Sequence, residues 1–269
     1  MKMKKGILKF VHAGMALSFV LCFTTPSTGS EEKPTASTDV AFLSRYIWRG
    51  FELSEGWVIE PDVGVSYRGF SFGLWGNLDM DYNGGDPTMN DTAKWTETDW
   101  TISYEKTFGP ATVGLGYIYY GLDGTATEDS QEIYGTVTFD VFLSPTFTVY
   151  REIANAQAWY FNLGLSYSID LPKDMKLDFS GSAGYYLSEN DSFVEVDDTG
   201  TPTTSRYSAF QDGVLSASLA VPFAGYFTVT PTISYSFPLS QAADNLITSL
   251  SYNNDSSFLY GGVILSMSF

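Results

Sequence analysis

The chain has 269 residues and a formal net charge of −17, and 44% of its residues are hydrophobic. This acidic balance argues against nucleic acid as a partner, because proteins that bind nucleic acid are basic. It also argues against plain electrostatic adsorption to anionic lipid. With a single cysteine, Cys22, the chain cannot depend on a framework of internal disulfides.

Residues 1–30 have the features of a secretory signal peptide. Lys2, Lys4 and Lys5 form a basic start, and an apolar run follows over residues 10–23. Small residues then lead to Gly29 and Ser30, where we expect cleavage. The run is shorter than the roughly 20 residues that a membrane-spanning helix needs, which argues against an uncleaved anchor. Cleavage would lower the net charge from −17 to −21 and would remove the only cysteine and the only histidine.

Beyond residue 37, apolar and polar residues alternate with a period of two. In residues 57–67, for example, Ile59, Val63 and Val65 alternate with Glu60 and Asp62. Such alternation predicts strands with one buried face. We predict twelve strands near residues 38–50, 57–68, 70–82, 96–108, 111–121, 130–142, 145–153, 158–171, 176–189, 210–223, 226–239 and 256–269. Helical periodicity is confined to residues 241–250.

The connections between these strands alternate between short and long. Tight turns are expected at Arg68-Gly69, Gly109-Pro110, Ser144-Pro145, residues 172–175 and Ala224-Gly225. Residues 83–95, 122–129, 190–209 and 240–255 form long, polar and mostly acidic loops, while residues 154–157 are a short connection on the same side. This order predicts an up-and-down meander with short turns at one end and long loops at the other.

The two faces of the strands distinguish a membrane barrel from a soluble sandwich or lipocalin. A soluble sheet would carry lysine and glutamate on its polar face, whereas here serine, threonine, glycine, asparagine, aspartate and glutamate dominate. The apolar face is rich in aromatic residues near strand ends, which is typical of the girdles of outer-membrane barrels. Because backbone groups in hydrocarbon must all pair, the sheet must close. We therefore predict an all-β fold, a closed antiparallel up-and-down transmembrane β-barrel of about 12 strands.

The predicted organisation is a signal peptide at residues 1–30, a short periplasmic segment at 31–37 and the barrel at 38–269. The last strand alternates up to Phe269, and a terminal aromatic residue resembles the assembly signal of bacterial outer-membrane proteins. The expected location is the outer membrane of a Gram-negative bacterium. The expected partners are outer-membrane lipid, lipopolysaccharide, the barrel assembly machinery through Phe269, and small solutes.

Two arginines in the first predicted strand give the first candidate site. Arg45 and Arg49 share a face, and a charge on the lipid face near mid-membrane costs roughly 2–4 kcal/mol, so we expect both in the lumen. Tyr46 and Trp48 would then lie in the outer aromatic belt. Keeping the faces matched through the connection at residues 51–56 pairs Arg45 with Asp62.

The same register extends the candidate site to neighbouring strands. The turn at Arg68-Gly69 sets Asp62 opposite Trp75, and Arg49 falls in the row of Val58 and Asp79. The candidates for a lumen constriction are Arg45, Arg49, Glu60, Asp62, Trp75 and Asp79. The Arg45–Asp62 pair has two interpretations: a polar constriction that orients a solute, or a packing pair that neutralises a buried charge.

The amino-terminal part of the barrel also resembles a known family. The stretch SRYIWRGFELSEGWVIEPDVGVSYRGFSFGLWGNLDMD resembles the start of the TorF-type porins of proteobacteria. The resemblance lies in the step Trp48-Arg49-Gly50, in Pro61 on the next strand, and in the motif at residues 72–76, and it covers about 40 of the 269 residues. It implies a porin-like barrel and no particular solute.

Enzymatic chemistry has little support in the sequence. The barrel lipases, deacylases and omptin-type proteases use histidine for proton transfer, and the predicted mature chain has none. Without cysteine or histidine the preferred ligands of transition metals are also missing, so we predict no enzyme, no cofactor and no such metal site. Acidic residues in the loops at 123–129 and 195–198 could bind Ca²⁺, but no fixed ligand spacing is present and a solvated acidic loop is the favoured interpretation.

Two functional classes remain. The first is a porin-like channel for passive passage of small polar, cationic or zwitterionic solutes, with weak cation preference because acids outnumber cations on the inward face. The second is a non-conducting barrel with a structural, adhesion or partner-binding role through its acidic extracellular loops. Inward glycines would leave space in the lumen, whereas inward aromatic residues such as Tyr120, Tyr160 and Tyr186 would take it away.

Overall fold

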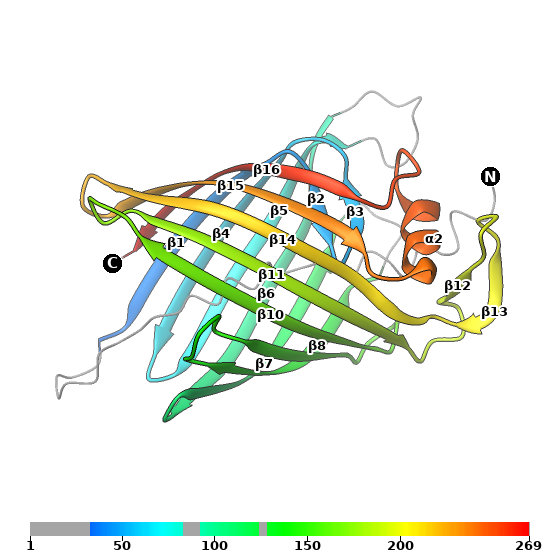
Figure 1. The fold of residues 1–269 in the computed structure, drawn as a ribbon, viewed down its shortest axis with the longest axis horizontal. Coiled ribbons are helices and arrows are strands. Elements are labelled where there is room, and N and C mark those ends of the chain that lie inside the picture. The colour runs from blue at the N-terminus through cyan, green and yellow to red at the C-terminus, as the bar shows by residue number, and fades with distance from the viewer. Residues whose placement is uncertain (1–32, 83–91, 124–127, 269) are drawn as a thin grey trace.

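The computed structural model describes residues 33–82, 92–123 and 128–268, which form a closed barrel of twelve antiparallel strands (Figure 1). The barrel strands are β1 (Thr35–Leu43), β4 (Val58–Tyr67), β5 (Phe70–Tyr82), β6 (Thr92–Phe108), β7 (Ala111–Leu122), β8 (Ser130–Phe139), β9 (Thr146–Glu152), β10 (Ala158–Asp170), β11 (Lys176–Ser188), β14 (Ser208–Phe223), β15 (Phe227–Pro238) and β16 (Phe258–Ser268). The predicted signal peptide and Phe269 lie outside the described residues.

The predicted topology is confirmed. Each predicted strand has a counterpart in the barrel, and β1 closes the sheet by pairing with both β16 and β4. The two-residue turn at Arg68-Gly69 has positive φ at both positions, 52° and 84°. This is the type I′ geometry, whose twist matches that of the strands it joins. The short turns lie at the same end as the start of β1 and the end of β16.

The outer surface of the barrel is apolar. Exposed side chains on the outward face include Val65, Phe72, Ile102, Leu115, Ile133, Leu163, Ile233 and Leu265, with aromatic residues such as Tyr67, Phe70, Tyr104, Phe108 and Phe223 near strand ends. The outward residues of neighbouring strands lie in register, as Leu163 does with Ala183 on β11 and Phe147 on β9. A continuous apolar band of this kind suits contact with hydrocarbon.

We expect an arginine in this band to be costly. Leu163 lies midway along β10 and is 50% exposed on the outward face. Leu163→Arg should destabilise the folded barrel in lipid by about 2–4 kcal/mol, because the charge would lie near the membrane midplane. Ser182→Arg on β11 is the control, because Ser182 pairs with Gly164 on the inward face. Equal unfolding free energies for the two variants in phospholipid vesicles would contradict the assignment of the faces.

The two halves of the lumen differ in character. Near the short turns, the inward face consists mainly of small polar residues, and hydroxyl pairs such as Thr136–Thr148 at 3.1 Å and Ser216–Ser234 at 2.8 Å link neighbouring strands. Near the long loops, large side chains fill the interior, among them Tyr120, Tyr160, Tyr186 and Phe258. The lumen is therefore lined by small polar groups at the turn end and packed at the loop end.

The largest departure from the predicted fold concerns the first strand, which was expected to run to residue 50. β1 ends at Leu43, and the chain then forms a separate hairpin of β2 (Tyr46–Trp48) and β3 (Phe51–Ser54). The turn of this hairpin is Arg49-Gly50, with φ of 46° and 82°, so it repeats the type I′ geometry of Arg68-Gly69. We call residues 44–57 the inner hairpin, because side chains of this segment contact several different barrel strands from inside.

The placement of Tyr46 and Trp48 in the outer aromatic belt was wrong. Both are buried, as are Ile47 and Phe51. Because the inner hairpin has apolar side chains on both faces, it buries more apolar area inside the lumen than it would as part of a wall with one polar face. The alternation needed for a wall strand also breaks at Tyr46-Ile47-Trp48, where three large apolar residues follow one another.

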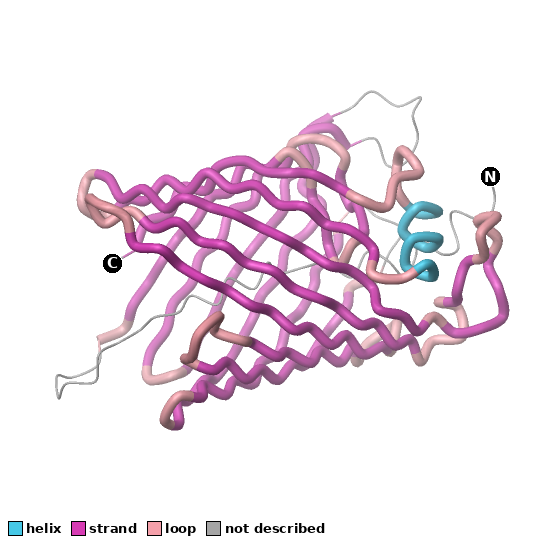
Figure 2. The backbone as a smooth tube through the Cα atoms, viewed as in Figure 1, coloured by secondary structure: helices cyan, strands magenta, loops and turns pink. Residues whose placement is uncertain are grey.

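The loop end of the barrel is covered by further elements. The helix α2 (Gln241–Leu250) confirms the helical periodicity of that segment, and the side chain of Ser240 caps it by accepting from the Ala243 N–H. A second hairpin, β12 (Val194–Val196) with β13 (Pro202–Arg206), joins α2 through the Asn245 side chain, which donates to the Val196 carbonyl at 3.1 Å. Figure 2 shows the helix and this hairpin at the same end of the barrel. Among the described residues, no helix is long and apolar enough to cross a membrane.

Candidate functional site in the lumen

The turn of the inner hairpin places one arginine at the centre of the packed half of the lumen. Arg49 Nη1 donates to Glu132 Oε1 at 2.9 Å, and Nη2 donates to Oε2 at 2.8 Å. The two side chains are 6% and 2% exposed, and Glu132 lies on β8, far from β1 around the barrel. Such a two-point contact fixes both the position and the orientation of the guanidinium. It ties the tip of the inner hairpin to the barrel wall.

Aromatic rings surround the same guanidinium. The Arg49 Cζ atom lies 4.6 Å from the ring centre of Trp48, 4.9 Å from that of Tyr150 and 4.2 Å from that of Tyr160. The Tyr160 hydroxyl donates to Asp212 Oδ1 at 2.8 Å, and the Tyr120 hydroxyl donates to Glu132 Oε2 at 2.8 Å. Ring faces attract a cation most strongly where water is excluded, so this cage stabilises the buried charge of Arg49.

The backbone of the turn is held from the opposite part of the wall. Gln211 on β14 donates from Nε2 to the Arg49 carbonyl at 3.0 Å and accepts from the Tyr207 hydroxyl. Gly50 leaves no space for a side chain, because a Cβ atom there would lie 3.0 Å from Ile247 Cδ1 and 3.1 Å from Asp212 Cβ. The tip of the inner hairpin is therefore anchored to β8, β14 and α2 together.

The base of the inner hairpin is held by a second ion pair. Arg45 donates to Glu52 across the hairpin, and Glu52 Oε2 also accepts from the Tyr252 N–H at 3.2 Å. Asn253 adds a hydrogen bond from Nδ2 to Glu55 Oε2 at 3.0 Å. The partner of Arg45 is thus a residue of the hairpin itself, and the loop that follows α2 closes over it.

The predicted register is partly right. Asp62 pairs with Trp75 and Val58 pairs with Asp79, as expected. The predicted pairing of Arg45 with Asp62 is wrong, because β1 leaves the wall at Leu43 and the residue opposite Asp62 is Asp39. Arg49 likewise does not lie in the row of Val58 and Asp79, since the turn carries it across the lumen to Glu132.

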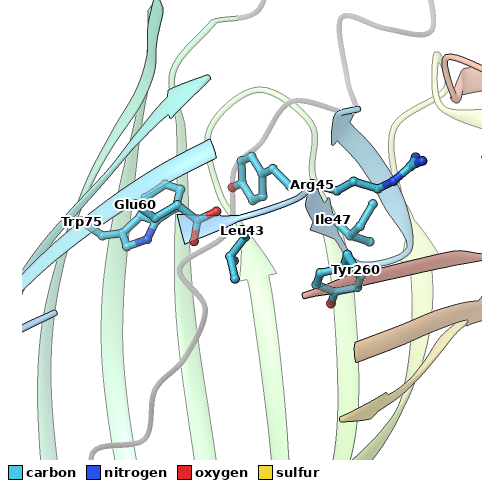
Figure 3. Close-up of a pocket in the computed structure, with 7 residues that line it drawn as sticks. Leu43, Arg45, Ile47, Glu60, Trp75 and Tyr260 are labelled. Atoms are coloured by element: carbon cyan, nitrogen blue, oxygen red, sulfur yellow. The ribbon is translucent and has the colours of Figure 1, made fainter. Parts of the chain in front are cut away.

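The remaining candidates lie together on the opposite side of the inner hairpin. Glu60 on β4 and Trp75 on β5 line a small cavity with Leu43, Arg45, Tyr46, Ile47 and Tyr260 (Figure 3). The rings of Tyr46 and Trp75 are 5.6 Å apart, and the Tyr46 hydroxyl donates to Glu97 Oε2 at 3.2 Å. Glu97 and Asp99 alternate on the inward face of β6, and Asp99 pairs with Trp75. Asp79 is buried and accepts from the Asp81 N–H at 2.9 Å.

The buried charges of the described residues are strongly unbalanced. Eight buried acids stand against one buried arginine, Arg49. The acids are Glu52, Glu60, Asp79, Glu97, Asp99, Glu132, Glu152 and Asp212. Sequence reasoning named two of these, Glu60 and Asp79, as lumen candidates. It did not connect Glu132 or Tyr160 with Arg49, because these contacts join residues about a hundred positions apart across the lumen.

Two of the loop acids considered as Ca²⁺ ligands, Asp129 and Asp197, serve as local turn acceptors. Asp129 accepts from the Tyr119 hydroxyl and from the Leu122 N–H at 3.1 Å. Asp197 accepts from the hydroxyl and N–H of Thr199 and from the Thr201 N–H, and these bonds hold the pKa of its carboxyl below the usual range. In the part of the chain that the structure describes, no three acidic, histidine or cysteine residues are grouped to hold a metal ion.

Comparison with known proteins gives similarity at the level of structure only. No protein-family model matches the chain, and no curated protein does. Among solved structures, the NanC porin matches with 13% identity over 86% of this chain and 98% of its own, at a TM-score of 0.47. The COG4313 outer membrane channel from Pseudomonas putida F1 matches with 8% identity over 91% and 100%, at 0.48. LpxR from Salmonella typhimurium matches with 6% identity over 88% and 99%, at 0.44. The TorF-type resemblance stays a sequence-based expectation.

Proposed function

We propose that the protein is a bacterial outer-membrane channel for small cationic or zwitterionic solutes, constricted by its inner hairpin. The observation that carries the proposal is the charge of the lumen. Among the residues that the structure describes, eight buried acids face one buried arginine, and that arginine is already paired with Glu132. An acid-lined narrow passage raises the local concentration of cations and repels anions.

The closed sheet and its apolar outer band support a location in the outer membrane. A closed barrel leaves no unpaired strand edge in hydrocarbon, and its resistance to unfolding by detergent is a common consequence of that pairing. We expect the unheated protein to migrate differently from the boiled protein on a detergent gel. We also expect protease to cut only in the long loops. Recovery of the protein from the soluble periplasmic fraction would contradict the proposal.

The polar half of the lumen supports passage from the turn end. Small inward residues there include Gly64, Gly73 and Gly164, and a Cβ atom added at Gly73 would meet nothing within 4 Å. Solutes can therefore approach the acids without displacing bulky side chains in this half. The inner hairpin, at the other end, is the element that a solute has to pass.

A second candidate function is a non-conducting barrel that acts through its loops. It is favoured by the packing of the hairpin tip, because Trp48, Arg49 and Phe51 are all buried between opposite walls. If the inner hairpin never leaves this position, the barrel would present acidic loops to a partner and carry no solute.

Single-channel recording in planar bilayers separates the two candidates. The channel proposal predicts discrete conductance steps for the purified wild-type protein in KCl. A silent wild-type protein that conducts once the inner hairpin is removed would instead support the non-conducting candidate. The control is the same preparation after boiling, which should be silent in either case because the barrel is unfolded.

A further inference from the structure

We propose that Glu60 and the rings of Tyr46 and Trp75, with Glu97 and Asp99 adding negative charge from β6, form a binding site for a small primary ammonium group. The inference deepens the proposed channel function, on which it rests for the route of the solute, by naming the class of solute that the lumen selects. The site lies between the inner hairpin and the wall formed by β4, β5 and β6.

The acids of this site have fewer partners than the other buried acids, and among the described residues Glu97 accepts only from the Tyr46 hydroxyl, through Oε2. Both carboxylate oxygens of Asp99, and Oε1 of Glu97, are buried without a hydrogen-bond partner of good geometry. Glu60 forms no hydrogen bond or ion pair with any residue that the structure describes. These three residues are 4% exposed or less. Burying a charged carboxylate without a partner costs free energy, so a positive group bound here would stabilise it.

Other buried carboxylates in the same lumen have several hydrogen-bond partners. Glu132 holds Arg49 and accepts from Tyr120. Glu152 accepts from the Ser130 hydroxyl at 2.9 Å and from three successive backbone N–H groups of residues 154–156. Among the buried acids that the structure describes, carboxylate oxygens without a partner are therefore found on one side of the inner hairpin.

The cations of the described chain that come near are engaged elsewhere. Arg49 is bound by Glu132, and Arg45, although it lines the same cavity, pairs with Glu52. Figure 3 shows the Arg45 guanidinium directed away from Glu60. Lys94 on β6 lies over the ring of Tyr82, with its Nζ atom 4.5 Å from the ring centre. No cation among the described protein groups therefore balances these acids, and a cation from solution is free to do so.

The walls of the cavity favour an organic cation over a metal ion. Tyr46 and Trp75 present ring surfaces beside Glu60, and Leu43 and Ile47 add aliphatic contacts. An ammonium group can donate a hydrogen bond to Glu60 while its carbon atoms rest on the rings. Mg²⁺ and Ca²⁺ prefer a cage of oxygen ligands, and no such cage is present among the described residues. The small size of the cavity excludes all but the smallest organic cations.

A row of acids connects this site with the open half of the lumen. On β4, Glu60 and Asp62 are successive inward residues, and Asp62 lies opposite both Asp39 and Trp75. A cation that enters from the turn end would meet Asp39 and Asp62 before it reaches Glu60. The approach to the cavity from the turn end therefore begins with two carboxylates.

Saturation-transfer NMR on the folded protein in detergent tests the site, with methylammonium as the probe and ionic strength held constant. We expect saturable transfer to the methyl protons, and we expect Glu60→Gln and Asp99→Asn each to raise the apparent Kd by about tenfold or more. Glu105→Gln is the matched control, because Glu105 lies further along β6 near the short turns and should leave the Kd unchanged. Each variant is first shown to be folded by its shift on heating in a detergent gel.

Several outcomes would overturn the site. These are no transfer to the wild-type protein, equal loss of transfer in the Glu105→Gln control, and displacement of methylammonium by an equal concentration of K⁺. Conductance without methylammonium binding would overturn the site and leave the channel standing. Binding that depends on Glu60 in a protein without conductance would support the site and count against the channel.

Discussion

Removal of the inner hairpin should raise the single-channel conductance severalfold. Leu43 at the end of β1 and Val58 at the start of β4 are paired across the two strands. A two-residue Asn-Gly turn in place of residues 44–57 therefore suffices to join the strands in type I′ geometry. Trp48, Arg49 and Phe51 fill the lumen between opposite walls. Without them, water would occupy this space.

The control for this deletion shortens a loop that does not enter the lumen. Residues 197–201 join β12 to β13 in an exposed turn, and an Asn-Gly turn in their place should leave the conductance unchanged. Both proteins should keep the heat-dependent shift of a folded barrel. An unchanged conductance in a folded protein without residues 44–57 would show that the inner hairpin does not set the constriction.

Arg49→Ala should destabilise the protein by about 3–5 kcal/mol, because it leaves Glu132 charged and buried without its partner. The double variant Arg49→Ala with Glu132→Gln should recover part of this loss, since the neutral amide can keep the hydrogen bond with Tyr120. Urea unfolding of the folded barrels in vesicles measures both. The single variant should also show larger and noisier conductance, because the ion pair anchors the tip of the inner hairpin.

Arg206→Ala is the control for that experiment. Arg206 also forms an ion pair, with Asp191, but the two side chains are 54% and 84% exposed. An exposed ion pair contributes little, so the loss should be roughly 1 kcal/mol or less. Similar losses for Arg206→Ala and Arg49→Ala would contradict the central role given to the Arg49–Glu132 pair.

Much of the fold could be predicted from the sequence, because each strand of the barrel wall has an alternating pattern of apolar and polar residues. Each residue of such a strand faces either lipid or lumen, so alternation marks the strand and the turn residues fix its register. The tight turn at Arg68-Gly69 was enough to place Asp62 opposite Trp75, and the structure agrees. The helical period at residues 241–250 was also visible, and α2 occupies that segment.

The inner hairpin was missed although a local signal was present. Arg49-Gly50 repeats the dipeptide of the turn at Arg68-Gly69, and both adopt the same positive φ values within a few degrees. The stretch Tyr46-Ile47-Trp48 also breaks the alternation. The arginines were instead interpreted as inward residues of a continuous strand, which gave the wrong partner for Arg45. That Arg49 is inside was right, but its contact with Glu132 depends on closure of the barrel, which no local pattern contains.

Reversal potentials in a KCl gradient test the central claim most directly. They should be recorded on the wild-type protein and on the protein without residues 44–57, at low salt where charges in the lumen are least screened. The acid-lined lumen predicts preference for K⁺ over Cl⁻ in the wild-type protein, weaker once the lumen is wide. Glu60→Gln should reduce the preference of the wild-type protein. A clear preference for Cl⁻ would contradict the proposal, because it would mean that Arg49 and Arg45, and not the acids, govern the constriction.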